Sequence, residues 1–279
     1  MHIKRIVTLL AFLTAMPLLS RAQQADTSGY KLVWADEFDT DGPVDPKSWQ
    51  FEEGFKRNNE AQWYQPQNAV CRKGMLVISA EKVHQPNPGY VAGSKDWRTG
   101  REYIEYTSAS INTSGLHQWQ YGRFVMRARI PTDDGLWPAF WTLGEKGQWP
   151  SNGEIDIMEY YRNMLLANIA CGTATAYKAK WYSVTKDIKT FGPGWSKQFH
   201  IWRMDWDEQA ISLYVDDSLL NRVPLSDLTN RDAEAINPFK QPHYILLNLA
   251  IGGDNGGDPA NTRFPQQYEV DYVRVYQRK

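Results

Sequence analysis

The sequence has few of the residues that mark specialised architectures. Cysteine occurs only at Cys71 and Cys171 among 279 residues, which excludes a disulfide scaffold. A single bridge and two buried free thiols both stay open, and the free thiols are favoured. Lys and Arg number 31 against 32 Asp and Glu, so the chain lacks the basic surface that attracts nucleic acid or an anionic membrane. The five histidines are scattered, without the spacing of a zinc site.

Long apolar runs are also absent beyond the N-terminus. Two basic residues precede an apolar run over 6–19, and a small-residue cleavage site, Ser-Arg-Ala, then ends at Ala22. The run is shorter than the roughly 20 residues that span a bilayer. We therefore interpret 1–22 as a signal peptide and 23–279 as one exported domain, secreted or periplasmic, with an uncleaved membrane anchor as the alternative.

The patterns that are present favour β-strands over helices. Short segments with alternating apolar and polar residues are separated by Gly, Pro, Asn and Asp, which is typical of an all-β sandwich or barrel. We predict strands over 75–80, 121–130, 155–160, 199–206, 211–215, 244–251 and 269–276. Asp216 and Asp217 predict a hairpin turn, and 178–195 is interpreted as an irregular insertion between strands.

Aromatic residues are abundant, with 12 Trp, 15 Tyr and 10 Phe making up 13% of the chain. Each buried indole N–H needs a hydrogen-bond partner, so a core is not easily filled with this many tryptophans. We expect some of the aromatic side chains to stack against flat faces of a ligand.

The most informative segment is 149–160, where Glu154, Asp156 and Glu159 interrupt an otherwise apolar strand. Residues two apart share one face of a strand, so Glu154 and Asp156 point together while Glu159 points away. One extra residue bulging at 157–158 returns Glu159 to the face of the other two acids. Such bulges are frequent beside active sites.

Three acids on one strand face suggest a specific chemistry. Two carboxylates about 5–5.5 Å apart are the arrangement of a retaining glycosidase, in which one attacks the sugar and the other protonates the leaving oxygen. Asp156 would then hydrogen-bond the nucleophile, and its negative charge would help to keep the acid protonated. The alternative is a solvated polar face on an edge strand, where acids block aggregation.

The sequence Glu-Ile-Asp-Ile-Met-Glu over 154–159 resembles the E-x-D-x-x-E signature of glycoside hydrolase family 16, in the bulged form of its laminarinase-like and agarase-like branch. Other landmarks extend the resemblance, in the family's order, over essentially the whole mature chain. They are Trp34-Ala-Asp-Glu-Phe38, Asn58-Asn-Glu60 with Tyr64, Tyr106-Thr-Ser108, Tyr121-Gly-Arg-Phe124, Gly135-Leu-Trp-Pro-Ala-Phe-Trp141, Leu247-Asn-Leu-Ala-Ile-Gly-Gly253 and Val270-Asp-Tyr-Val-Arg-Val-Tyr276. The resemblance implies a concanavalin-like β-jelly-roll sandwich whose concave cleft binds an extended polysaccharide.

The resemblance also implies roles for single residues. Glu154 matches the nucleophile, Glu159 the acid/base and Asp156 a helper, while Asn59 matches a residue that reaches a sugar hydroxyl on the minus side. Sugar platforms and walls are implied at Trp137, Trp141 and Trp149, with core packing as the alternative. A structural calcium on the convex face is implied at Glu37, at the carbonyl of Gly74 and at Asp271, with ordinary surface acids as the alternative.

Two departures bear on the substrate. Laminarin-cleaving relatives usually carry Arg where this chain has Ser110, and they tend to carry a His in a Gly-Thr-x-His strand where 171–177 has none. We expect an endo-acting retaining β-glycanase that hydrolyses internal β-1,3 or β-1,4 linkages, with a laminarin-type β-glucan favoured. An endo-β-galactosidase acting on algal galactans or mucin-type glycans is the alternative, and a non-catalytic carbohydrate-binding protein is a remote one. The resemblance implies a monomer that needs no cofactor for catalysis and has a polysaccharide or oligosaccharide as its partner.

Overall fold

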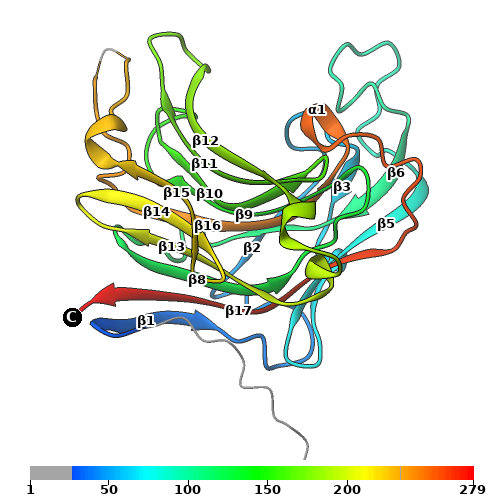
Figure 1. The fold of residues 1–279 in the computed structure, drawn as a ribbon. Helices are drawn as coiled ribbons and strands as arrows, with labels where there is room; N and C mark the ends of the chain where they lie inside the picture. The colour runs from blue at the N-terminus through cyan, green and yellow to red at the C-terminus, as the bar shows by residue number, and fades with distance from the viewer. Residues whose placement is uncertain (1–26, 233) are drawn as a thin grey trace, which may run out of the picture.

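The computed structural model describes residues 27–232 and 234–279. The expected signal peptide, 1–22, lies outside these residues. Across the described ranges, no helix has the length and apolar character needed to cross a membrane. Strands dominate the fold, which Figure 1 shows as two sheets stacked in layers.

Within the described residues, ten strands form one sheet. They are β1 (Tyr30–Asp36), β3 (Gln62–Tyr64), β4 (Ala69–Cys71), β5 (Leu76–Pro86), β6 (Tyr103–Ser108), β8 (Gly122–Arg129), β13 (His200–Trp206), β14 (Ala210–Val215), β15 (Ser218–Pro224) and β17 (Gln266–Arg278). Their order is β15-β14-β13-β8-β17-β5-β6-β3, with β1 beside β17 and β4 beside β5. This sheet forms the lower layer in Figure 1 over β8, β13 and β17.

Seven strands of the same described part form the second sheet. They are β2 (Gln50–Glu52), β7 (Ser110–Asn112), β9 (Leu136–Gly144), β10 (Glu154–Tyr161), β11 (Met164–Gly172), β12 (Ala179–Asp187) and β16 (His243–Ile251), in the order β12-β11-β10-β9-β16-β7-β2. Short helices connect strands of the two sheets: η1 (Pro66–Asn68), η2 (Ile188–Phe191), η3 (Trp195–Lys197), η4 (Leu225–Asp227) and α1 (Gly253–Gly256). The two-sheet sandwich confirms the predicted all-β jelly roll.

Alternation along β8 explains how the sheets pack. Phe124, Met126 and Ala128 are completely buried in the core between the sheets. The intervening Arg127 and Arg129 lie on the outer face and form ion pairs with acids of the neighbouring β17. Period-two alternation therefore separates an apolar inner face from a charged outer face, as the sequence predicts.

Most sequence-based elements are confirmed, with one error. Each of the seven predicted strands is present with ends within three residues of the predicted ones, except that β5 continues to Pro86 where 80 was predicted. Asp216 and Asp217 both adopt positive φ in the predicted hairpin turn, and both cysteines are free and buried. The prediction of an irregular insertion over 178–195 is wrong, because β12 occupies much of it. As an edge strand, β12 is largely half-exposed, so polar residues at many of its positions hide the alternation.

Candidate active site

A bulge in β10 brings three acids to one face of the seven-stranded sheet. Asp156 pairs with Asn168 of β11, but Glu159 pairs with Leu166, so three steps along β10 match two along β11. The register against β9 shifts between Asp156 and Met158 as well. The predicted bulge is therefore present, and the side chains of all three acids line one pocket.

The bulge is anchored from the opposite face of the strand. Ile155, Ile157 and Met158 are completely buried in the core between the sheets. Two consecutive residues thus point into the core, which a regular strand does not permit. Their burial shifts the later residues of β10 by one position and turns Glu159 toward the pocket.

Glu154 is held by a tryptophan from the preceding loop. Trp149 donates its indole N–H to Oε2 of Glu154, while 39% of the Trp149 side chain remains exposed. Burial raises the pKa of Glu154, and this rise is opposed by hydrogen bonds from Trp149 and Asp156 and by the charge of Arg57. Three groups therefore favour the ionised form that a nucleophile requires.

Asp156 behaves differently from the expectation. It is 4% exposed, and burial together with the charges of Glu154 and Glu159 raises its pKa well above the usual range. A hydrogen bond to Glu154 raises the pKa of Asp156 further and lowers that of Glu154. These effects favour the protonated form of Asp156, which donates to Glu154, over the negative charge expected from the sequence.

Glu159 has the properties of a general acid. Its Oε1 accepts the indole N–H of Trp137 over 2.7 Å, and its Oε2 accepts the amide of Asn168 over 2.8 Å. Burial, and then the charge of Glu154, raise its pKa to about 8 against the opposition of these two hydrogen bonds. Glu159 thus carries a proton at neutral pH, which is the state that an acid catalyst must start from.

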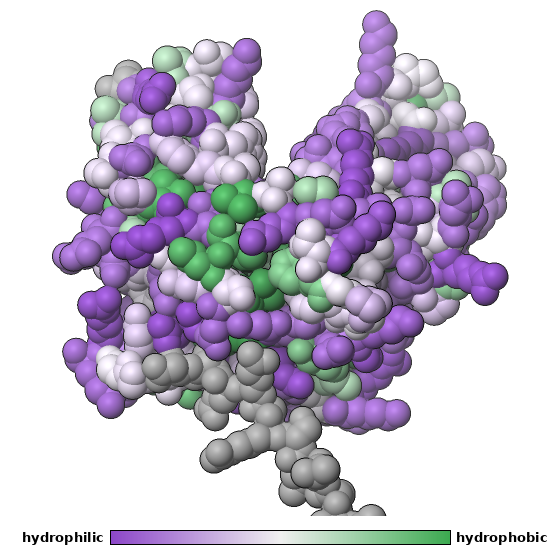
Figure 2. Space-filling view, viewed as in Figure 1, coloured by the Kyte–Doolittle hydropathy of each residue, from purple (hydrophilic) through white to green (hydrophobic). Residues whose placement is uncertain are grey.

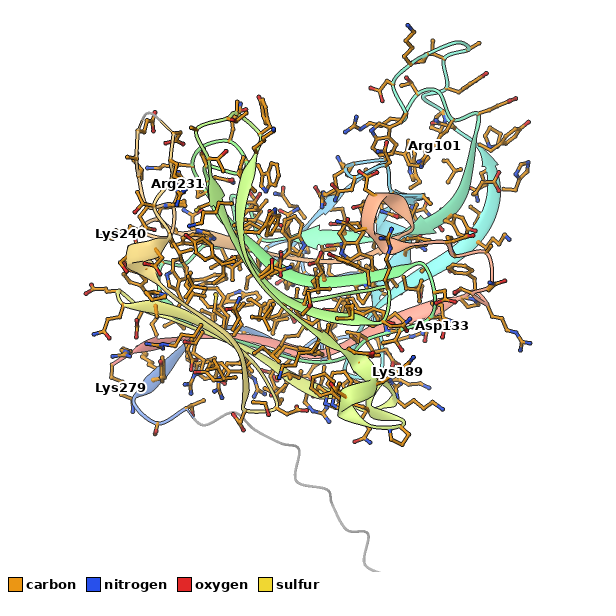
Figure 3. The ribbon with its side chains drawn as sticks, turned by 45° about the horizontal axis from the view of Figure 1, so that its top comes forward. Arg101, Asp133, Lys189, Arg231, Lys240 and Lys279 are labelled. Carbon is orange, nitrogen blue, oxygen red and sulfur yellow. The ribbon has the colours of Figure 1, made fainter. Side chains whose placement is uncertain are left out.

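The pocket around the acids lies in an open hollow. Figure 2 shows the molecule hollowed at the top between two raised parts. Arg101 lies on one raised part and Arg231 on the other in Figure 3. Arg101 donates to the backbone carbonyls of Asn59 and Glu60 over 2.8 and 2.5 Å, which ties the loop over 57–60 to its side of the hollow. The pocket is lined by Arg57, Asn58, Glu60, Trp137, Ala139, Trp141, Glu154, Asp156, Glu159 and Asn248.

The three predicted tryptophans take different positions at this site. Trp137 and Trp141 line the pocket but are only 6% and 8% exposed, and each donates its indole N–H, to Glu159 and to Asn248 respectively. Trp149 is the most exposed of the three, and it also lines a neighbouring cavity of about 600 Å³, together with Tyr177. Trp149 therefore offers the largest aromatic surface to a sugar among the three.

The structure places Asn58, rather than Asn59, on the pocket wall. The Asn59 amide donates to Oδ1 of Asp254 over 2.9 Å, on the exposed side of the loop. Asn58 lines the pocket, and its amide donates to Oε1 of the buried Glu60 over 3.2 Å. Asn58 and Glu60 thus line the pocket while Asn59 between them does not, which the motif alone does not resolve.

The residues implied in a calcium site are engaged in ion pairs. Both carboxylate oxygens of Glu37 accept from Arg274 over 2.7 Å, and Asp271 accepts from Arg127 over 2.7 Å. In the described part of the chain, no group of three or more His, Cys, Asp or Glu side chains could hold a metal ion. With its carboxylates neutralised by guanidinium groups, this arrangement does not fit the oxygen-rich shell of calcium.

Sequence reasoning missed two residues that contribute directly to the site. Asn168 donates to both Asp156 and Glu159, and its sequence signal is a lone polar residue in the apolar strand β11. Arg57 lines the pocket and donates to Glu52, which also accepts the hydroxyl of Ser110 over 2.6 Å. Ser110, where the resemblance implies Arg, thus supports a cation that comes from another segment.

Comparison with known proteins places this site in a family. The model of glycosyl hydrolases family 16 matches residues 56–274. The chain belongs to this family. A β-glucanase from Rhodothermus marinus is 36% identical over 292 residues, covering 98% of this chain and 94% of the relative. The chain is therefore a glycoside hydrolase, acting on O-glycosidic bonds.

Solved structures of the family resemble this family 16 hydrolase closely. The laminarinase catalytic domain from Thermotoga maritima has a TM-score of 0.75 and 32% identity, over 90% of this chain and 99% of that one. A structure from work on endo-acting O-glycanases, with which members of the human gut microbiota initiate mucin breakdown, has a TM-score of 0.80 and 32% identity, over 90% and 92%. Both the bulged strand and its acids thus lie in a fold shared with polysaccharide-cleaving and glycan-cleaving enzymes.

Proposed function

We propose that this family 16 hydrolase cleaves internal β-1,3 or β-1,4 linkages of a polysaccharide with retention of anomeric configuration. The observation that carries the proposal is the bulge in β10, which brings Glu154, Asp156 and Glu159 into one pocket. Burial raises the pKa of both glutamates, to about 8 for Glu159, whereas hydrogen bonds from Trp149 and Asp156 and the charge of Arg57 oppose the rise at Glu154. A retaining glycosidase needs one ionised and one protonated carboxyl group, and these contacts assign the ionised one to Glu154.

The reaction follows from these two states. The Glu154 carboxylate attacks the anomeric carbon while Glu159 transfers its proton to the departing glycosidic oxygen, which breaks the glycosidic bond and leaves a glycosyl ester on Glu154. Glu159, now ionised, takes a proton from water, whose oxygen attacks the anomeric carbon and releases Glu154. The proposed reaction requires no cofactor.

A β-glucan of the laminarin type is the favoured substrate. This preference is supported by the similarity of the chain to the β-glucanase from R. marinus and to the laminarinase from T. maritima, both named as β-glucan-cleaving enzymes. A galactose-containing chain, of algal or mucin type, is the second candidate, supported by the likeness to the mucin-degrading O-glycanases. The same candidate is favoured by Ser110 and by the absence of His over 171–177, at the positions where the sequence departs from laminarin-cleaving relatives.

The test is incubation of residues 23–279 with laminarin, mixed-linkage β-glucan, agar, galactan and mucin glycans, followed by mass analysis of the released oligosaccharides. We expect products of several chain lengths from laminarin and loss of at least about 10³-fold in kcat for Glu154→Gln. Glu208→Gln, an exposed acid in the turn before β14, is the matched control. Cleavage of galactose-containing chains alone would replace the glucan by the second candidate. Binding without cleavage by the wild-type protein would make the chain a carbohydrate-binding protein.

Export, domain boundaries and assembly complete the proposal. Residues 1–22 act as a signal peptide, and 23–279 form one monomeric catalytic domain that works outside the cytoplasm. Fractionation of expressing cells, with the N-terminus of the mature protein determined by mass, tests removal of 1–22. Light scattering of 23–279 tests the monomer. The structural calcium that the resemblance implies at Glu37, Gly74 and Asp271 is not part of this proposal, because Arg274 and Arg127 already bind the two carboxylates, and chelation tests it.

A further inference from the structure

Arg57, which lines the pocket, forms a charged pair with Glu52, and the pair is fixed from two sides. Glu52 ends β2, and Arg57 lies in the loop that follows it. Nη2 of Arg57 donates to Oε2 of Glu52, and the same oxygen accepts the hydroxyl of Ser110 over 2.6 Å. Glu52 lies directly opposite Ser110 in the β2–β7 pairing, so the sheet itself sets the position of the carboxylate. The guanidinium is thereby held by a carboxylate that has little freedom to move.

The pair leaves one donor and one acceptor unused. Among the described residues, buried Nη1 of Arg57 has no hydrogen-bond partner, and no hydrogen bond reaches Oε1 of Glu52. The side chains of Arg57 and Glu52 are 24% and 22% exposed, so a ligand in the hollow reaches their edge. A buried donor without a partner is costly, so the Arg57 guanidinium keeps hydrogen-bonding capacity that Glu52 does not satisfy.

The position of the pair relates it to the cleavage site. Arg57 lines the same pocket as Glu154, and its charge acts on the Glu154 carboxylate. Its guanidinium carbon lies 5.2 Å from the centre of the Trp141 ring, so the cation covers part of that aromatic face. A sugar that approaches Glu154 on this side therefore meets Arg57.

The charges around the pair favour a neutral ligand. Four acids, at 60, 154, 156 and 159, line the pocket, and Arg57 is the one basic residue among its described lining residues. Glu52 already neutralises Arg57. Burial raises the pKa of Glu52, but the charge of Arg57 and the hydrogen bonds from Arg57 and Ser110 outweigh it, so the pKa lies below its usual range. A sulfate or carboxylate group on a sugar only accepts hydrogen bonds and would meet the ionised Glu52, whereas a hydroxyl can accept from a guanidinium and donate to a carboxylate at once.

We propose that Glu52 and Arg57 form a hydroxyl-recognition pair that determines which neutral sugar is accepted next to Glu154. One hydroxyl accepts a hydrogen bond from the Arg57 guanidinium and donates one to the Glu52 carboxylate, where the two side chains are partly exposed. The pair is a specificity determinant, since it contacts the substrate without touching the reacting atoms. This inference rests on the proposed function and specifies the subsite that discriminates between sugars.

The experiment measures binding without chemistry. In the Glu154→Gln background, affinity for a neutral oligosaccharide released by the wild-type enzyme is measured by calorimetry with and without Arg57→Met. We expect an affinity loss of about tenfold or more for Arg57→Met, and a similar loss for Glu52→Gln. Arg57→Lys should not restore binding, because an ammonium does not reproduce the fixed donor geometry. Arg278→Met, at an exposed arginine paired with Asp207, is the matched control.

The outcomes separate this inference from the proposed function. Unchanged affinity, within twofold, for Arg57→Met would overturn the recognition pair while leaving the hydrolase intact. Tighter binding of a sulfated oligosaccharide, lost with Arg57→Met, would overturn the neutral-hydroxyl assignment. Ser110→Ala, which removes one support of Glu52, should lower affinity by about threefold without changing the melting temperature of the protein by more than a few degrees. Failure of the Arg278→Met control to bind any oligosaccharide, with no cleavage by the wild-type protein, would overturn the proposed function itself.

Discussion

Trp137 donates its indole N–H to Oε1 of Glu159 over 2.7 Å and so stabilises the ionised form of the acid catalyst. The hydrogen bond opposes the burial that raises the pKa of Glu159 to about 8. Removing the donor in Trp137→Phe should therefore raise this pKa further. We expect the alkaline limb of the kcat/KM profile, near pH 8 in the wild type, to move to higher pH. Trp141→Phe, whose indole bonds Asn248 instead, is the matched control and should leave the limb in place.

Asp156 should tolerate replacement by Asn better than by Ala. Its pKa is raised well above the usual range by burial, first of all, and by the charges of Glu154 and Glu159, which favours the neutral form that donates a hydrogen bond. Asn keeps a neutral donor of the same shape, whereas Ala removes the hydrogen bond to Glu154. We expect kcat/KM to fall less than about tenfold for Asp156→Asn and about 10²-fold or more for Asp156→Ala. A larger loss for Asn than for Ala would mean that Asp156 acts as an anion.

Glu159 should lower the stability of the folded protein as pH rises. Its pKa is raised from 4.5 to about 8 on folding, so the folded state binds the proton more tightly than the unfolded state. The free energy of unfolding therefore decreases between about pH 4.5 and pH 8 and is level above that range. Glu159→Gln removes this titration. We expect its melting temperature to exceed that of the wild type by a few degrees at pH 8, with a smaller difference at pH 5.

Calcium removal should have little effect if the ion pairs on the convex face persist in solution. Glu37 is bound by Arg274 through both oxygens, and Asp271 by Arg127. A calcium ion would have to displace both guanidinium groups. We expect EDTA to lower the melting temperature by less than about 2 °C, measured by differential scanning fluorimetry with and without added Ca²⁺. A decrease of five degrees or more, reversed by Ca²⁺ but not by Mg²⁺, would establish the site that the resemblance implies.

The fold and the acids were predictable because they depend on local patterns. Alternation along β8 separates core from surface within one strand, so 121–130 could be assigned without knowledge of its neighbours. The bulge at 157–158 was predictable for a similar reason, since only an extra residue reconciles the spacing of the acids with one strand face. Each of these inferences uses a period that the sequence itself displays.

The rest of the site depends on contacts between distant segments. Asn168 donates to Glu159 because β11 pairs with β10 in one particular register, and that register cannot be predicted from either strand alone. The raised pKa of Asp156 arises chiefly from burial by surrounding elements, which its local sequence does not reveal. From the sequence alone, Arg57 is a solvated loop cation. Its role becomes apparent only when the pairing of β2 with β7 places Glu52 opposite Ser110.

The bulge in β10 also determines what changes the family 16 site can accept. Because Ile157 and Met158 are both buried in the core, each change of side-chain volume there alters the direction of Glu159 as well as the packing. Losing one residue at this point would restore a regular strand and turn the acid catalyst into the sandwich interior. Insertions and deletions in this strand should therefore abolish activity even at positions where point substitutions are tolerated. New specificities are accordingly more readily acquired in the loops that surround the hollow.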